Sequence, residues 1–461
     1  MVSSPLVRRP VARNPVVPPP ARSLWVLALI PDAFGSHGGI SKFNRDLLTA
    51  LCSHPNCAEV VALPRLMPES PGTLPGKLTW VTDGLGGKLR YLRAAVRIAR
   101  RNPSPLGSQP PTPNHLRSCR PAVSSSSGQE QQPSTTYSQL TAEVPRGFDL
   151  VICGHINLLP AAFLARRLLS RVRGHAAVPL ALFMHGIEVW EPHRSALVRS
   201  LVRRVDAFVS VSAFTRDLFV CWSRVSAANG LLLPNCVDLT GFRPGERDPV
   251  LLKKYGLSGR KVLMTLGRLL PDRPKGIDEV LETLPSLIVD FPQLSYLICG
   301  DGSDRPRLVN KARSLGLSVS DLALTSDLQP PSAISDLPSP LVVFAGRLPE
   351  SEKAAHYQLA DAFIMPGYGE GFGIVYLEAL ACGIPVLAST LDASREALLD
   401  GEMGLLVDPR NRAELRQGIL QVLQQPRGQV PPGLEHFSFP HFVKRCHAII
   451  DNLCPAAIAC S

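Results

Sequence analysis

The sequence predicts an α/β protein built from two doubly wound, Rossmann-like halves that face a central cleft. Short apolar runs end in Gly, Ser or Asn, for example LWVLALIP from residue 24, LALFMHG from 180 and KVLMTLGR from 261. Helical stretches separate these runs, and strands that alternate with helices form open parallel sheets whose functional loops follow the carboxyl ends of the strands. A chain of 461 residues is long enough for two such halves.

The elements fall into four consecutive parts. Residues 1–22 contain Arg and Pro but no acid, and fit either a flexible basic tail or a short organelle transit peptide. A first domain is expected over 23–243, with a helix at Ile40–Cys52 and a disordered, Ser-, Pro- and Gln-rich insertion at 102–146. A second domain is expected over 244–438, with an irregular insertion at 318–340. The last part, 439–461, contains a closing helix at Phe442–Leu453 and a tail.

Composition and charge exclude several classes of protein. The net charge is +11, which favours an anionic substrate or contact with an anionic membrane surface. No nucleic-acid-binding motif accompanies that charge, so no nucleic-acid partner is expected. No apolar run is long enough to span a bilayer. The 11 cysteines form no CxxC pair, which disfavours zinc and redox motifs and indicates a cytoplasmic, reducing compartment.

The segment Pro366–Ser389, PGYGEGFGIVYLEALACGIPVLAS, contains the highest density of candidate functional residues in the sequence. Glu370 and Glu378 are separated by seven residues, which corresponds to roughly 10 Å at the helical rise of 1.5 Å per residue. Gly371 and Gly373 allow the backbone to approach a ligand closely. A helix that begins just after them offers free N–H groups to a diphosphate. The alternative is an ordinary amphipathic helix that carries two glutamates.

This segment resembles the E-x7-E signature of family 4 (group 1) retaining glycosyltransferases, which have the GT-B fold. The resemblance extends from Leu24 to about Lys444, apart from the two insertions. Further stretches follow in the order of the family: SHGGISKFNRDLL, LFMHGIEVWEP, FVSVSAFTRD, LPNCVDLTGFRP, TLGRLLPDRPKGID, LICGDGSD, YQLADAFIMPG and SREALLDGEMGLLVDP.

In the second domain the resemblance implies a donor site. Glu370 matches the glutamate that faces the donor sugar, and Glu378 the one that binds the ribose hydroxyls. Arg268 and Lys275 match the basic pair on the diphosphate, where fixed cations stabilise the charge of the leaving group. The backbone N–H groups expected to hold sugar hydroxyls and phosphate oxygens are those of Gly371, Phe372, Gly373 and Ile374.

In the first domain the resemblance implies contacts to the donor and the acceptor. His185 matches a histidine that reaches the donor sugar, and Gly38 and Gly39 match a glycine pair beside the donor phosphates. His155 occupies a loop on the acceptor side. Glu188 fits either a lining of the acceptor cleft or simple packing.

The implied activity is that of a hexosyltransferase that moves a sugar from a nucleoside diphosphate sugar to an acceptor hydroxyl with retention of configuration. No metal site or cofactor is expected, because the sequence contains no Asp-x-Asp motif. The alternatives are a GT-B nucleotide-sugar epimerase and a catalytically silent binding protein with the same fold. An NAD-dependent oxidoreductase is excluded, because no GxGxxG follows the first strand. Donor, oligomeric state and acceptor stay open, the acceptor being a polysaccharide in biosynthesis, a lipid-linked glycan, a lipid or a small metabolite.

Overall fold

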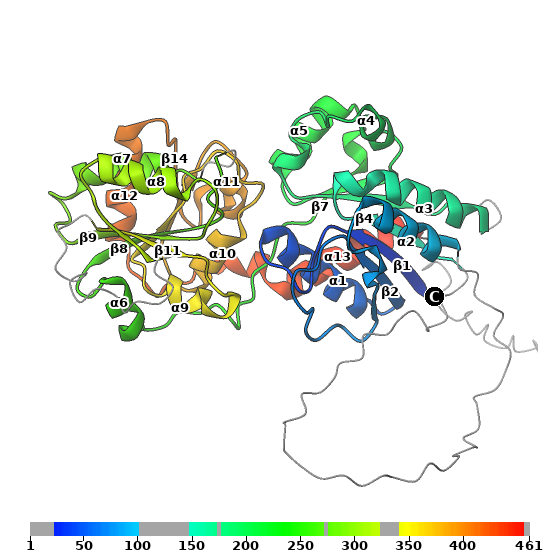
Figure 1. Ribbon diagram of the computed structural model, residues 1–461, viewed down its shortest axis with the longest axis horizontal. Coiled ribbons are helices and arrows are strands. Elements are labelled where there is room, and N and C mark those ends of the chain that lie inside the picture. The colour runs from blue at the N-terminus through cyan, green and yellow to red at the C-terminus, as the bar shows by residue number, and fades with distance from the viewer. Residues whose placement is uncertain (1–22, 101–146, 173–176, 272–274, 323–340, 456–461) are drawn as a thin grey trace, which may run out of the picture.

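The chain folds into two α/β lobes that lie side by side (Figure 1). This computed structural model describes residues 23–100, 147–172, 177–271, 275–322 and 341–455. The predicted basic tail at 1–22 and insertion at 102–146 therefore lie outside the described residues.

The first lobe contains a parallel sheet that, within the described residues, has seven strands in the order β3-β2-β1-β4-β5-β6-β7. The described chain enters the sheet at β1, winds outward to β3, and then returns to β4 on the other side of β1. The strands are β1 (Leu24–Ile30), β2 (Cys57–Pro64), β3 (Leu78–Trp80), β4 (Leu150–Cys153), β5 (Leu180–Met184), β6 (Ala207–Ser210) and β7 (Gly230–Leu232). The helices are α1 (Gly39–Ser53), α2 (Lys88–Arg100), α3 (Leu159–Val172), α4 (Ala196–Val202) and α5 (Ala213–Ser223).

The second lobe repeats this plan, with seven described strands in the order β10-β11-β9-β8-β12-β13-β14. The strands are β8 (Lys261–Leu266), β9 (Leu294–Cys299), β10 (Ser318–Asp321), β11 (Leu341–Gly346), β12 (Ala362–Ile364), β13 (Val386–Ser389) and β14 (Leu405–Val407). The helices are α6 (Pro249–Tyr255), α7 (Ile277–Leu287), α8 (Arg305–Ser314), α9 (Lys353–Tyr357), α10 (Ile374–Ala381), α11 (Ser394–Ala397) and α12 (Arg412–Gln424). The chain then continues into α13 (Phe439–Leu453).

Both sheets are parallel, and the crossover helices that parallel strands require cover both faces, so the strands are almost continuously apolar. All five residues of β5 and all six of β9 are buried. The topology confirms the predicted pair of doubly wound halves. It also places a switch point, where the winding direction reverses, between β1 and β4 and between β8 and β12.

The prediction that the whole of 318–340 is an irregular insertion is wrong at its start. Ser318–Asp321 forms β10, which pairs in parallel with β11 from Ser318 opposite Leu341 to Asp321 opposite Phe344. An edge strand has a neighbour on one side only, so the short polar run SVSD suffices for it. Residues 323–340 lie outside the described part of the chain.

The last helix returns to the first lobe, which the sequence did not indicate. Helix α13 begins three residues before the predicted Phe442 and lies against α1 (Figure 1). Phe442 is fully buried and meets the ring of Phe43 edge to face, with 5.8 Å between ring centroids. The two chain segments that connect the lobes also touch, because the N–H of Val237 donates to the carbonyl of Phe437.

Candidate functional site

The loops after β5 and β12 meet where the two lobes face each other. The Oγ of Ser212, at the start of α5, donates to the carbonyl of Gly371 at 2.8 Å. A Cβ atom added to Gly371 would lie 2.1 Å from the carbonyl oxygen of His185. The carboxyl edges of both sheets therefore come together around Gly371, at the position where ligands bind in doubly wound sheets.

Glu370 and Lys275, two of the predicted site residues, form an ion pair at this edge. Glu370 lies in the loop between β12 and α10, and Lys275 directly precedes the start of α7. The Nζ of Lys275 is 2.5 Å from Oε2 of Glu370, and the two side chains are only 16% and 22% exposed. The pair places a cation and an anion together at the carboxyl edge of the second sheet.

A residue that the sequence reasoning missed holds Glu370 in place. The fully buried Asp392 accepts the backbone N–H of Glu370 at 2.8 Å, and its other oxygen accepts the N–H of Ser394 at 3.0 Å. Burial raises the pKa of Asp392 to about 6. Asp392 lies two residues before the start of the family motif SREALLDGEMGLLVDP, which was the only sequence feature that could have pointed to it. The sequence predicts no chemical role for that motif.

Glu378 lies inside α10, as the spacing of the motif predicts, and is 1% exposed. Its Oε2 accepts the hydroxyl of Tyr357 at 2.8 Å, and Lys353 Nζ is 3.6 Å from Oε1. Burial raises the pKa of this carboxyl, and the charge of Lys353 acts in the opposite direction. Oε1 is buried and has no hydrogen-bond partner among the described residues.

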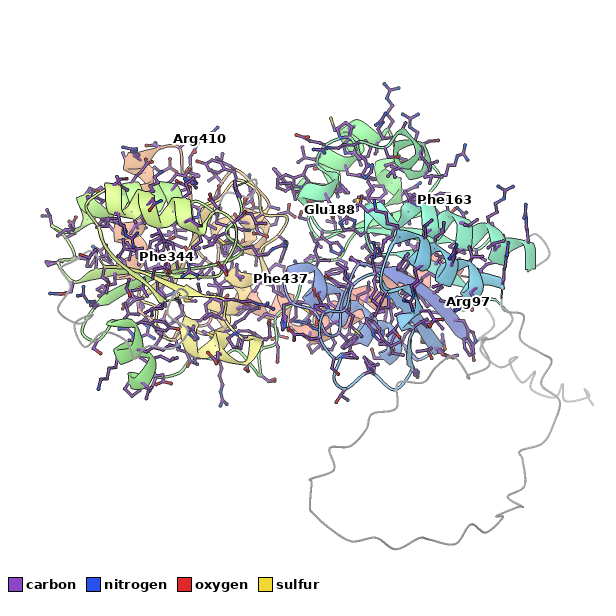
Figure 2. All side chains as sticks on the ribbon, viewed as in Figure 1. Arg97, Phe163, Glu188, Phe344, Arg410 and Phe437 are labelled. Atoms are coloured by element: carbon purple, nitrogen blue, oxygen red, sulfur yellow. The ribbon has the colours of Figure 1, made fainter. Side chains whose placement is uncertain are left out.

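The four residues after Glu370 differ in what they can offer a ligand. Gly373 takes a left-handed φ of 90° and is the N-cap of α10, and Ile374 is the first residue of that helix. The first N–H groups of a helix have no acceptor within the helix. Phe372 is buried and its ring packs on Phe437, with 5.5 Å between centroids, so only its backbone can serve a ligand. Figure 2 shows Phe437 at the junction of the lobes.

His185 follows β5 and faces the loop that carries Gly371. Its Nε2 is 2.9 Å from the carbonyl of Gly154, and its Nδ1 is buried without a hydrogen-bond partner in the described residues. The backbone N–H of His185 donates to Oε1 of Glu188 at 2.5 Å. Glu188 therefore fixes the turn that presents His185, and Figure 2 shows it on the side of the first lobe that faces the second.

His155 and the glycine pair occupy the loops after β4 and β1. The Nδ1 of His155 accepts the N–H of Asn157 at 3.1 Å, and burial lowers the pKa of the ring. Gly38 has a φ of 104° and precedes α1. A Cβ atom at Gly38 or at Gly39 would meet no atom within 4 Å, so this loop borders open space.

Arg268 lies in the loop after β8, two residues beyond the end of the strand, and is exposed. In the described parts of the chain, no three His, Cys, Asp and Glu side chains are grouped so as to hold a metal ion. Within the same residues, no helix combines the length and apolarity that crossing a membrane requires.

Two family models match the chain and together cover most of it. The model described as "Glycosyltransferase Family 4" matches residues 37–240, and the model described as "Glycosyl transferases group 1" matches residues 260–425. Each match falls on one lobe. The chain belongs to the family 4, or group 1, glycosyltransferases.

Several similar proteins have names that describe mannosyl transfer to inositol-containing acceptors. A GDP-mannose-dependent alpha-(1-6)-phosphatidylinositol monomannoside mannosyltransferase of Mycolicibacterium smegmatis is 32% identical over 278 residues, which cover 59% of this chain and 64% of that protein. A phosphatidyl-myo-inositol mannosyltransferase of Mycobacterium tuberculosis is 32% identical over 235 residues, which cover 50% and 53%. The matched part thus spans less than two thirds of each relative.

Solved structures agree with the fold. Anabaena HepE in complex with UDP and glucose superposes with a TM-score of 0.61 at 16% identity, covering 93% of this chain and all of the other. Sucrose-phosphate synthase from Thermosynechococcus elongatus gives 0.59 at 16% identity, covering 94% of this chain and all of the other. The fold is GT-B, as the sequence predicts.

Proposed function

We propose that the protein is a retaining glycosyltransferase that moves a sugar from a nucleoside diphosphate sugar to an acceptor hydroxyl. The observation that carries this proposal is the Lys275–Glu370 ion pair at the carboxyl edge of the second sheet, opposite His185 of the first. Family membership supports the same reaction class. The intact ion pair argues against a silent binding protein.

Each residue of the pair has a distinct task in this reaction. Cleavage of the sugar–phosphate bond leaves negative charge on the diphosphate, which Lys275, Arg268 and the N-terminus of α10 stabilise. Glu370 orients the sugar, and its carboxylate supports the positive charge that develops on the ring. Asp392 restrains Glu370 through its backbone, so the carboxylate keeps its orientation when Lys275 turns to the diphosphate. The acceptor hydroxyl attacks from the face that the diphosphate leaves and passes its proton to the departing phosphate oxygen, so the configuration is retained.

We further propose GDP-mannose as the donor, because mannosyl transfer recurs in the names of the similar proteins. The ribose of the nucleotide is assigned to Glu378, since its Oε1 is buried without a hydrogen-bond partner in the described residues and has only the ion-pair contact with Lys353. A carboxylate forms the stronger, charge-assisted hydrogen bonds with hydroxyl donors.

The acceptor is proposed to be an inositol-bearing anionic lipid at a membrane surface. Helix α2 buries its apolar face against α3 and exposes five basic side chains together with Leu89, which is 71% exposed. The basic residues are Lys88, Arg90, Arg93, Arg97 and Arg100. Basic side chains beside an exposed apolar one bind anionic lipid surfaces. Figure 2 shows Arg97 of this helix on the first lobe, and Arg410, a basic control, on the second.

The test uses the purified full-length chain with GDP-mannose, UDP-glucose and ADP-glucose, each with and without phosphatidylinositol vesicles. We expect GDP release that depends on both GDP-mannose and the lipid, and an α-linked product. Release from another nucleotide sugar would reject GDP-mannose but keep the reaction class. Formation of an isomeric nucleotide sugar without acceptor would instead identify an epimerase. Binding to the vesicles should fall in Arg90→Glu/Arg93→Glu and stay unchanged in Arg410→Glu.

A further inference from the structure

The segment that follows β13 forms hydrogen bonds with both the backbone N–H and the backbone carbonyl of Glu370. The carboxylate of Asp392 accepts the N–H of Glu370 at 2.8 Å, and the N–H of Ala393 donates to its carbonyl at 3.1 Å. Asp392 and Ala393 are both fully buried. The backbone position of Glu370 therefore follows that of residues 392–393.

The same segment reaches the other lobe four residues later. Glu396, in α11, accepts the backbone N–H groups of Ala213 and Phe214 at the N-terminus of α5, both at 2.7 Å. A carboxylate at a helix N-terminus gains from charge-assisted hydrogen bonds and from the helix dipole. This contact crosses from the second lobe to the first.

Helix α5 does not need Glu396 as its ordinary cap. Ser212 already fills that role, since its Oγ accepts the N–H of Thr215 at 3.1 Å. The hydroxyl of Ser212 also donates to Gly371, the residue after Glu370. Thus the start of α5 touches both the loop that carries Glu370 and the segment that holds that loop.

We propose that Glu396 is a positioning residue that couples closure of the two lobes to the placement of Glu370. When α5 docks, its two N–H groups fix Glu396, and the single turn between Asp392 and Glu396 transmits that position to the peptide unit of Glu370. In an open arrangement Glu396 loses both donors, and the Glu370 loop is held by Asp392 and Ala393 alone. The proposal deepens the proposed function and rests on it for the role of Glu370.

Ala213→Pro gives a test from the opposite side of the contact. Proline at this position removes one of the two N–H groups that donate to Glu396 and leaves that of Phe214, and it suits the first position of a helix. The preceding Ser212 has a φ of −151° and a ψ of 156°, which is the extended conformation that a following proline requires. Glu402→Ala is the matched control, because this glutamate is exposed in the same lobe.

The experiment compares the wild type with Glu396→Ala, Ala213→Pro, the double variant and Glu402→Ala. We expect Glu396→Ala and Ala213→Pro each to lower kcat about ten- to a hundredfold, since a shift of about 1 Å in a reacting group costs that much. Affinity for GDP, which the proposed function assigns to the second lobe, should change less than threefold. The double variant should be no slower than Glu396→Ala, because Glu396→Ala already removes the hydrogen bond that Ala213→Pro removes.

Amide hydrogen exchange supplies a readout that does not require activity. Exchange at the Glu370 amide should be at least tenfold faster in Glu396→Ala and Ala213→Pro, and unchanged in Glu402→Ala. A merely local cap would speed exchange within α5 and leave the Glu370 amide untouched, and that result overturns the proposal. If the wild type consumes no nucleotide sugar, the proposed function fails while exchange still decides the coupling. Should Glu396→Ala not fold, Glu396→Gln, which keeps the packing, replaces it.

Discussion

Gly371 allows a contact between the lobes that alanine would prevent. Its backbone is not in the left-handed region, so alanine at this position meets no conformational penalty of its own. A Cβ atom there would lie 2.1 Å from the carbonyl oxygen of His185 and 2.7 Å from the Cα of Gly186. Ordinary contact begins near 3.4 Å, so the lobes would have to separate by about 1.3 Å at this point.

We expect Gly371→Ala to lower kcat about a hundredfold, because a misplacement of roughly 1 Å in the reacting groups costs that much. The substitution lies at the junction of the lobes, so the melting temperature should stay close to that of the wild type. Steady-state consumption of the nucleotide sugar measures the first effect. Distances between fluorophores placed on the two lobes measure the separation.

Gly369→Ala is the matched control in the same loop. A Cβ atom at this position would have only Ile187 Cδ1 nearby, at 4.0 Å, which is ordinary contact. Its kcat should stay within about threefold of the wild type. The reasoning is refuted if Gly371→Ala keeps full activity and an unchanged distance between the lobes, since the contact seen here would then play no part in the active state.

Three further predictions address the ion pair, the buried acid and the last helix. Lys275→Met should lower kcat about 10²- to 10³-fold by removing a cation from the leaving diphosphate; an unchanged kcat rejects its role. Because the pKa of Asp392 is raised from 3.8 to about 6, its contribution to stability is full below pH 4 and is lost as the pH rises through 6. The free-energy cost of Asp392→Asn in urea denaturation should therefore shrink by about 2 kcal/mol between pH 4 and pH 7, and a cost that grows with pH contradicts this. Phe442→Ala should cost about 3–5 kcal/mol in the same assay, because Phe442 is fully buried against Phe43; a loss below 1 kcal/mol would mean that α13 does not stabilise the first lobe.

Most of the fold was predictable from local patterns of apolar residues in the sequence. Strand β1, with all but one of its residues buried, appears in the sequence as the apolar run LWVLALI, and α1 begins one residue before the predicted Ile40. These elements were predictable because their apolar periodicity depends only on which faces are buried. Strand β10 was missed because an edge strand of polar residues has no such pattern.

The candidate site was predictable only in part, and for a similar reason. Glu370 and Glu378 stand out because both fall within one short segment, around a helix N-terminus. Asp392 and Glu396 did not stand out, because their partners are backbone N–H groups that leave no trace in residue type. The contact of Asp392 spans 22 residues and those of Glu396 span more than 180, so no local pattern could reveal them.

The sequence by itself determined the two doubly wound halves, the family and the charged residues of the candidate site. These follow from the local pattern of apolar, glycine and charged residues, and that pattern can be read without knowledge of distant contacts. Only the tertiary structure decided that α13 returns to α1, that Lys275 pairs with Glu370, and that Glu396 joins the lobes. Such contacts depend on how two separately folded sheets pack against each other, and the packing of distant segments is not encoded at any single position of the chain.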